Sequence, residues 1–153
     1  MPFRTIAAGL IGAFALLGVL LLAGPAGAVQ LITASEAALP AGQAKGHERG
    51  ITRAPSVVIV SPSPAAGMMK SPVSLKIRYE GHGGAKIDVD SVLLTYVRSP
   101  EIDLTQRIKP FIAADGIDVQ DADVPPGTHT IRVLVTDTEG RTNWADFTFT
   151  VGQ

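Results

Sequence analysis

The sequence predicts an all-β protein, an antiparallel sandwich of two sheets built from about seven short strands. Three observations predict this fold class. Apolar and polar residues alternate with a period of two through most of residues 55–153, as in strands with one buried face. Clusters of glycine, proline, aspartate and serine separate these stretches and are typical of turns. The same residues lack the apolar period of an amphipathic helix.

Residues 1–28 have the pattern of an export signal. Arg4 supplies a positive charge, residues 6–23 form an apolar run, and small residues occupy the cleavage position at 26–28. We therefore expect a mature protein that is periplasmic or secreted. The alternative is an uncleaved segment that anchors the chain in the inner membrane through residues 6–23, because this run is close to the minimum length of a bilayer span.

Residues 29–54 are expected to form a tether between the signal and the domain. Within this segment, Thr33 and Glu36 have the spacing of a capping box, which predicts a short helix through Ala38. Residues 41–53 that follow are rich in glycine and charged side chains, and this composition predicts a flexible spacer.

The domain itself is expected over residues 55–153. Its predicted strands and short apolar pieces cover residues 57–60, 73–79, 92–97, 102–104, 108–112, 116–119, 130–136 and 144–151. The alternation is cleanest over residues 73–79. Pro110 cannot donate to a ladder, so the piece around it is expected at an edge or a bulge. The last two strands are joined by a hairpin loop in which Gly140 is available for positive φ.

Two rows of side chains are expected to face each other in the core. One row comes from residues 73–79 and the other from the last hairpin. Their members are Leu75, Ile77 and Tyr79 on one side, and Val133, Val135, Phe147 and Phe149 on the other.

Several segments resemble bacterial immunoglobulin-like (Ig-like) domains. Residues 125–140 and 147–151 look like the last hairpin of those domains, residues 87–92 look like the entry into their third strand, and residues 61–75 are similar to their opening. The resemblance covers about residues 56–151 and implies an Ig-like antiparallel β-sandwich. This fold serves adhesins, enzyme appendages, receptors and carriers alike, so the resemblance is specific for fold and not for function.

One branch of these folds carries copper in the periplasm, and its members are similar to this chain in the order of their segments. They typically have a histidine at the mature N-terminus and a second one in an Asp-Gly-His turn before the last strand. Here the mature chain would begin at Val29, and the last turn reads Glu139-Gly140-Arg141. Both expected ligands are missing, so we expect no copper site of this kind.

The composition argues against several kinds of chemistry. The chain has no cysteine, which rules out disulfides, thiolate metal sites, thiol nucleophiles and a lipoprotein anchor. Its 13 basic and 14 acidic residues give a net charge of −1 without a basic cluster, which argues against a nucleic-acid partner. His47, His82 and His129 lack metal-ligand spacing and are predicted to be solvated loop residues.

The acidic residues leave one alternative open. Asp115, Asp118, Asp121 and Asp123 cluster before a Pro-Pro-Gly turn, and loop carboxylates of this kind can bind calcium. Their spacing is not that of an EF-hand, and aspartate is a favoured turn residue. We therefore predict turn chemistry here, with no catalytic, cofactor-binding or metal-ligating residue in the chain.

Trp144 and Leu134 are predicted on the outer face of the last hairpin. They are either an exposed anchor for a partner or side chains covered by the tether or by residues 98–111, and we favour cover.

The sequence thus favours a non-catalytic exported module that binds another exported protein or has a structural role. The expected contact surfaces are an unpaired sheet edge and the loop over residues 99–111. The alternative is a small periplasmic carrier of copper or calcium that uses the aspartate cluster or isolated histidines. Membrane contact is expected only if the signal segment stays uncleaved.

Overall fold

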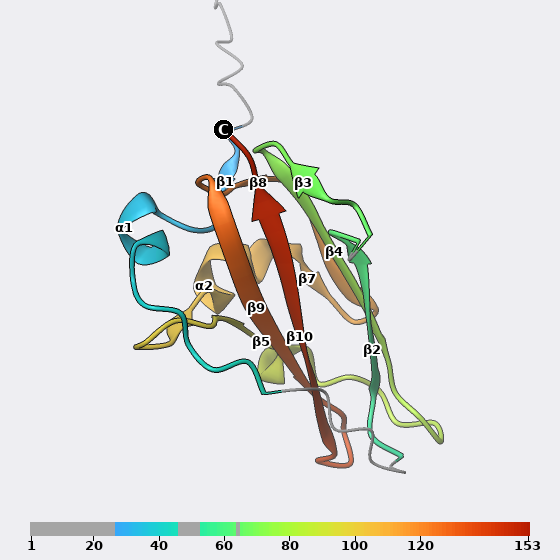
Figure 1. The fold of residues 1–153 in the computed structure, drawn as a ribbon. Coiled ribbons are helices and arrows are strands. Elements are labelled where there is room, and N and C mark those ends of the chain that lie inside the picture. The colour runs from blue at the N-terminus through green and yellow to red at the C-terminus, as the bar shows by residue number, and fades with distance from the viewer. Residues whose placement is uncertain (1–26, 46–52, 64) are drawn as a thin grey trace, which may run out of the picture.

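The computed structural model describes residues 27–45, 53–63 and 65–153, and in these residues ten strands form two five-stranded sheets (Figure 1). The predicted all-β class is confirmed. Four of the strands contain only two residues, so the number of long strands is close to the prediction. The export signal predicted over residues 1–28 falls almost wholly outside the described residues. Within the described ranges, no helix has the length and apolar content needed to cross a membrane.

The first sheet has the strand order β1-β8-β4-β2, with β7 also paired to β8. Its strands are β1 (Val29–Gln30), β2 (Ser56–Ser61), β4 (Val73–Glu80), β7 (Ile112–Ala113) and β8 (Gly116–Asp123). All pairs are antiparallel except β1 with β8, which is parallel. Strand β2 therefore ends the sheet on one side.

The second sheet has the strand order β3-β10-β9-β5-β6. Its strands are β3 (Met68–Met69), β5 (Leu93–Tyr96), β6 (Ile102–Asp103), β9 (Gly127–Thr136) and β10 (Thr142–Val151). The β9–β10 hairpin is antiparallel along its whole length. Strand β3 pairs in parallel with only the last two residues of β10. In the predicted hairpin loop Gly140 has φ of 77°, as expected.

The core lies between the two sheets and contains both predicted rows. The β4 row and the hairpin row belong to one cluster of buried side chains. Along β4, β9 and β10 buried residues alternate with more exposed ones, because successive side chains of a strand point to opposite faces.

The segment expected to be a tether contributes to the core, and this corrects the prediction for its first half. Leu31 and Ile32 are each only 1% exposed, and both backbone N–H groups donate to Asp123 O. The predicted capping box is present at helix α1 (Ala34–Ala37). Residues 46–52 of the predicted spacer lie outside the described residues.

The expected loop over residues 99–111 is a second correction. It contains β6, helix α2 (Thr105–Ile108) and the 3₁₀-helix η2 (Lys109–Phe111), and another 3₁₀-helix, η1 (Val89–Ser91), precedes β5. Leu104 and Ile108 are buried, so this segment packs onto the core. Pro110 lies in η2 and not in an edge strand, since proline suits the first turn of a helix.

Candidate functional site: the edge of strand β2

Strand β2 forms an open and uncharged edge of the first sheet. In the described part of the chain it pairs with β4 alone, and its sequence is Ser-Val-Val-Ile-Val-Ser. Val58 is 54% exposed and Val60 is 43% exposed. Natural edge strands are commonly protected by charged side chains, and β2 carries none.

The register of the sheet shows which backbone groups of β2 point away from it. Tyr79 N–H donates to Asp115 O at 3.2 Å, on the side of β4 that faces β8. In an antiparallel ladder such a residue forms a non-hydrogen-bonded pair with the opposite strand. Its β2 partner is Val57, and two residues further along Ile77 is opposite Ile59. The N–H and C=O groups of Val57 and Ile59 are therefore directed outward.

Both ends of β2 are fixed. The side-chain amide of Asn143 on β10 donates to Pro55 O at 2.8 Å, and Ser61 Oγ donates to Ser74 O at 2.7 Å. The pairing of β2 with β4 shifts register between Ile59 and Ser61, and such a bulge limits the regular ladder. The edge available for docking is thus short and preorganised, over residues 56–59.

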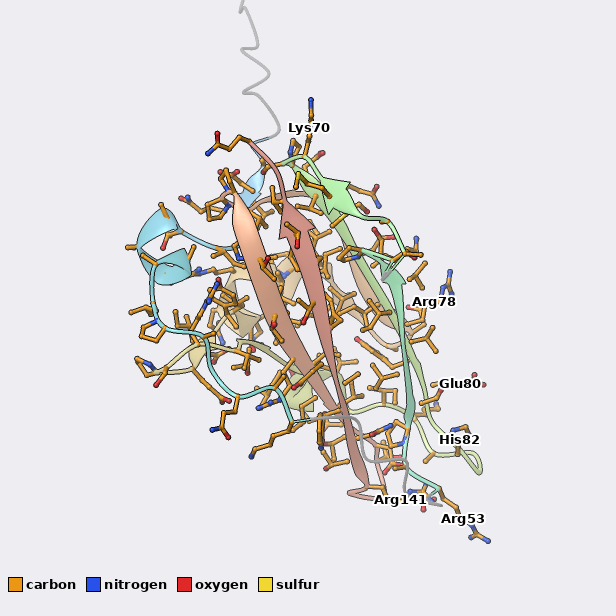
Figure 2. All side chains as sticks on the ribbon, viewed as in Figure 1. Arg53, Lys70, Arg78, Glu80, His82 and Arg141 are labelled. Carbon is orange, nitrogen blue, oxygen red and sulfur yellow. The ribbon has the colours of Figure 1, made fainter. Side chains whose placement is uncertain are left out.

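A shallow hollow of about 330 Å³ adjoins this edge, and its lining includes Val58, Arg78 and Glu80. Figure 2 shows Arg78 and Glu80 extending outward from the molecule. Tyr79, also in the lining, donates its hydroxyl to the backbone carbonyls of Ala113 and Gly116. Burial, followed by the charge of Asp115, raises the pKa of Tyr79 to about 12. This phenol stays neutral and links β4 to β7 and β8 on the inner side of the edge strand.

The four clustered aspartates do not converge on one point. Asp118 and Asp123 lie on the exposed face of β8, where Asp118 pairs with Lys76 Nζ at 2.7 Å and Asp123 accepts from Ser71 Oγ at 3.0 Å. The hydrogen bond from Lys76 holds the pKa of Asp118 below its ordinary value. In the described residues, no group of three or more histidine, aspartate or glutamate residues has a geometry that could hold a metal ion. Three of the four belong to a strand, not to the turn we predicted.

His129 is fully buried, which corrects the prediction that it is solvated. Its Nδ1 lies 2.8 Å from Tyr96 Oη and its Nε2 lies 2.8 Å from Pro125 O. A carbonyl can only accept, so Nε2 carries the proton and Nδ1 accepts from the tyrosine. Burial lowers the pKa of His129. On β9, His129 alternates in step with the buried residues Ile131 and Val133. This alternation was the signal in the sequence that its side chain is buried. His82 is exposed in its turn as expected, and His47 lies outside the described residues.

Trp144 and Leu134 are half-buried. The Arg132 guanidinium lies 5.5 Å from the centre of the Trp144 ring. Arg132 is held by Asp146 at 2.8 Å and by Glu101 at 3.0 Å. Trp144 is therefore covered in part by Arg132 of the same sheet. Glu101, which belongs to the predicted loop, helps to hold this arginine in place.

Three polar residues are buried in the described part of the chain, and each of them supports the backbone. Asp137 accepts from the N–H groups of Glu139 and Arg141 and from Arg141 Nε, which closes the last hairpin. Thr105 Oγ1 accepts from Leu94 N at 3.0 Å and joins α2 to β5. Together with His129, these are the buried polar residues of the described chain, and each stabilises a turn or a junction.

Comparison of the chain with protein-family models, with curated proteins and with solved structures finds no match. The candidate site therefore depends on the geometry alone. From the sequence we expected an accepting sheet edge, which was not assigned to a particular strand. The absence of charged residues from positions 56–61 was the feature of the sequence that marks β2 as an unprotected edge.

Proposed function

We propose that this chain is an exported, non-catalytic Ig-like module that binds an exported protein by accepting an extended segment along the outer edge of β2. An added strand would bond to the outward backbone groups of Val57 and Ile59, and main-chain bonds of this kind supply affinity in strand addition. The exposed Val58 and the adjoining hollow would supply side-chain selectivity.

One observation carries the proposal: β2 combines outward backbone groups with exposed apolar side chains and no protecting charge. The fixed ends of the strand support it, because a preorganised edge loses little entropy when a partner docks. The Ig-like assignment is supported by the resemblance of residues 56–151 and by the two packed sheets. Export is supported by the signal pattern of residues 1–28.

A non-catalytic role is supported by the commitments of the buried polar groups. Both ring nitrogens of His129 are engaged in structural hydrogen bonds, and the Asp137 carboxylate accepts three hydrogen bonds within its own turn. General acid–base chemistry needs such groups within reach of a substrate.

Affinity capture from extracts of the exporting host tests the proposed function. Full-chain bait is compared with Val58→Lys, which places a charge on the edge, and with Leu93→Lys, a control at a residue 43% exposed on the other sheet. We expect a stoichiometric partner, either another protein or a second copy of the chain, with the wild type and with Leu93→Lys. Binding should fall at least about tenfold with Val58→Lys, a loss of about 1.4 kcal/mol. Equal capture by all three baits would refute docking at β2.

A further inference from the structure

We propose that the strand accepted by β2 is β2 of a second copy of this chain, paired antiparallel about a two-fold axis that passes Val58. This inference rests on the proposed function and names the partner of the same edge. The two copies would join their first sheets into one continuous sheet. A second copy is favoured because it brings an identical uncharged edge with exposed valines, so that each copy covers the apolar side chains and outward backbone groups of the other.

The outward backbone groups select a single register. Residues opposite each other in an antiparallel pair lie on the same face, so the two-fold axis must pass a residue and not a peptide midpoint. Only Val57 and Ile59 of the regular ladder direct their N–H and C=O groups outward. Placing Val57 opposite Ile59 of the second copy satisfies all of these groups at once. Registers shifted by one pair leave half of them without a partner.

The side chains agree with this register. Val58, the most exposed residue of β2, meets Val58 of the second copy in a non-hydrogen-bonded pair, where Cα atoms are about 4.5 Å apart and side chains are closest. Val60, at the bulge, lies opposite Ser56 and diagonally beside Val58 of the other copy. The bulge therefore lies at the end of the interface and does not interrupt it.

The charges on the neighbouring β4 strands lie too far from the axis to favour or oppose this register. Glu80 is level with Ser56, and Lys76 is level with Ser61, just beyond the bulge at Val60. In the dimer, Glu80 comes level with Lys76 of the second copy, three strand spacings or about 14 Å away between backbones. Lys76 already pairs with Asp118 on β8 at 2.7 Å, on the side of β4 away from the axis, so it is not held toward Glu80 of the other copy. Arg78 faces Arg78 of the second copy at the same separation, where salt largely screens the repulsion.

Site-directed disulfide formation tests the register. The chain has no cysteine, so Val58→Cys introduces the only thiol, at a Cα separation that suits a disulfide. Val60→Cys is the matched control on the same strand, since the two residues at position 60 would be about 14 Å apart in the dimer. Leu93→Cys, at a residue 43% exposed on the other sheet, controls for random collision. Each full chain is expressed with its own N-terminal segment and oxidised in intact cells and after purification.

We expect Val58→Cys to cross-link at least about ten times faster than either control. We also expect the wild-type chain to sediment as a dimer that dissociates on dilution, because the interface is small. Equal cross-linking of all three variants, or a wild type that stays monomeric at the highest concentration tested, overturns the dimer. If such a monomer still captures a different protein through Val58, the proposed function holds while this inference fails. Loss of both results would refute the two together.

Discussion

At the scale of single residues, the polar groups inside the sandwich act on the backbone. His129 joins Tyr96 on β5 to the carbonyl of Pro125, just before β9. This arrangement requires the neutral ring, since burial penalises the charged form. A surface histidine and a buried one look alike in a list of residue types, and only the inward register on β9 distinguishes them.

The first prediction concerns the pH dependence of stability. The pKa of His129 is lowered in the folded protein below its ordinary value of 6.5, so below about pH 6.5 the unfolded chain binds more protons than the folded chain. The free energy of unfolding should therefore fall as the pH drops below that value. In His129→Gln this dependence should weaken. The substitution should also lower the free energy of unfolding by about 1–3 kcal/mol at neutral pH, because Tyr96 and the carbonyl of Pro125 are left with poorer hydrogen bonds.

Chemical denaturation of both proteins at several pH values between about 7.5 and about 5 measures this effect. All other ionisable groups are common to the two proteins, so their contributions cancel in the comparison. The lowered carboxyl pKa values of Glu36, Asp118 and Asp137 act only at lower pH. Parallel stability curves for wild type and His129→Gln would show that His129 does not titrate with folding.

At the scale of elements, period-two alternation located the long strands and their buried faces, as β4, β9 and β10 show. The short helix α1 was also predictable, since a capping box is a local signal. Helix α2 was not predictable, because the spacing of Leu104 and Ile108 fits a short apolar strand as well as a helix. The packing of both side chains on the core decides between helix and strand. Sheet order is equally hidden in local patterns, so an accepting edge could be expected but not assigned to β2.

The second prediction concerns the contact between α1 and α2. Arg107 binds the Glu36 carboxylate through two nitrogens and donates to Leu31 O at 2.8 Å. The Arg107 hydrogen bond lowers the pKa of Glu36 from 4.5 to about 2, so this stabilisation is present above pH 4.5 and is lost as the pH falls toward 2. Arg107→Leu should cost about 1–3 kcal/mol, because it removes charge-assisted hydrogen bonds from a partly buried site.

Thermal unfolding and backbone hydrogen exchange of residues 29–38 measure the effect of Arg107→Leu. Faster exchange should be confined to this segment and its contacts. Lys109→Leu is the control, since Lys109 is exposed on the neighbouring 3₁₀-helix and its loss should change stability by less than about 0.5 kcal/mol. Equal effects of the two substitutions would exclude a specific role for the Arg107 contact.

At the scale of the whole molecule, the fold closes with a segment that composition alone assigned to a tether. The parallel strand β1 pairs with the end of β8, and Leu31 and Ile32 enter the core. Two apolar residues in a small segment are too short a pattern to show a period, so their burial was not visible in the sequence. The consequence is that residues 55–153 do not hold the complete core of the sandwich.

The third prediction follows from this closure. Fully burying a leucine or isoleucine side chain contributes about 1.5–3 kcal/mol, so a fragment of residues 55–153 should lose about 3–6 kcal/mol from Leu31 and Ile32 alone. Domains of this size are typically stable by about 5–15 kcal/mol, so the fragment should be at or near the limit of folding, whereas residues 29–153 should unfold cooperatively at a clearly higher temperature. The double substitution Leu31→Ala and Ile32→Ala in the longer fragment separates the lost side chains from the lost backbone pairing, and it should account for most of the difference. Equal melting temperatures for the two fragments would mean that the domain begins at residue 55 after all, and that β1 docks on a sandwich already complete without it.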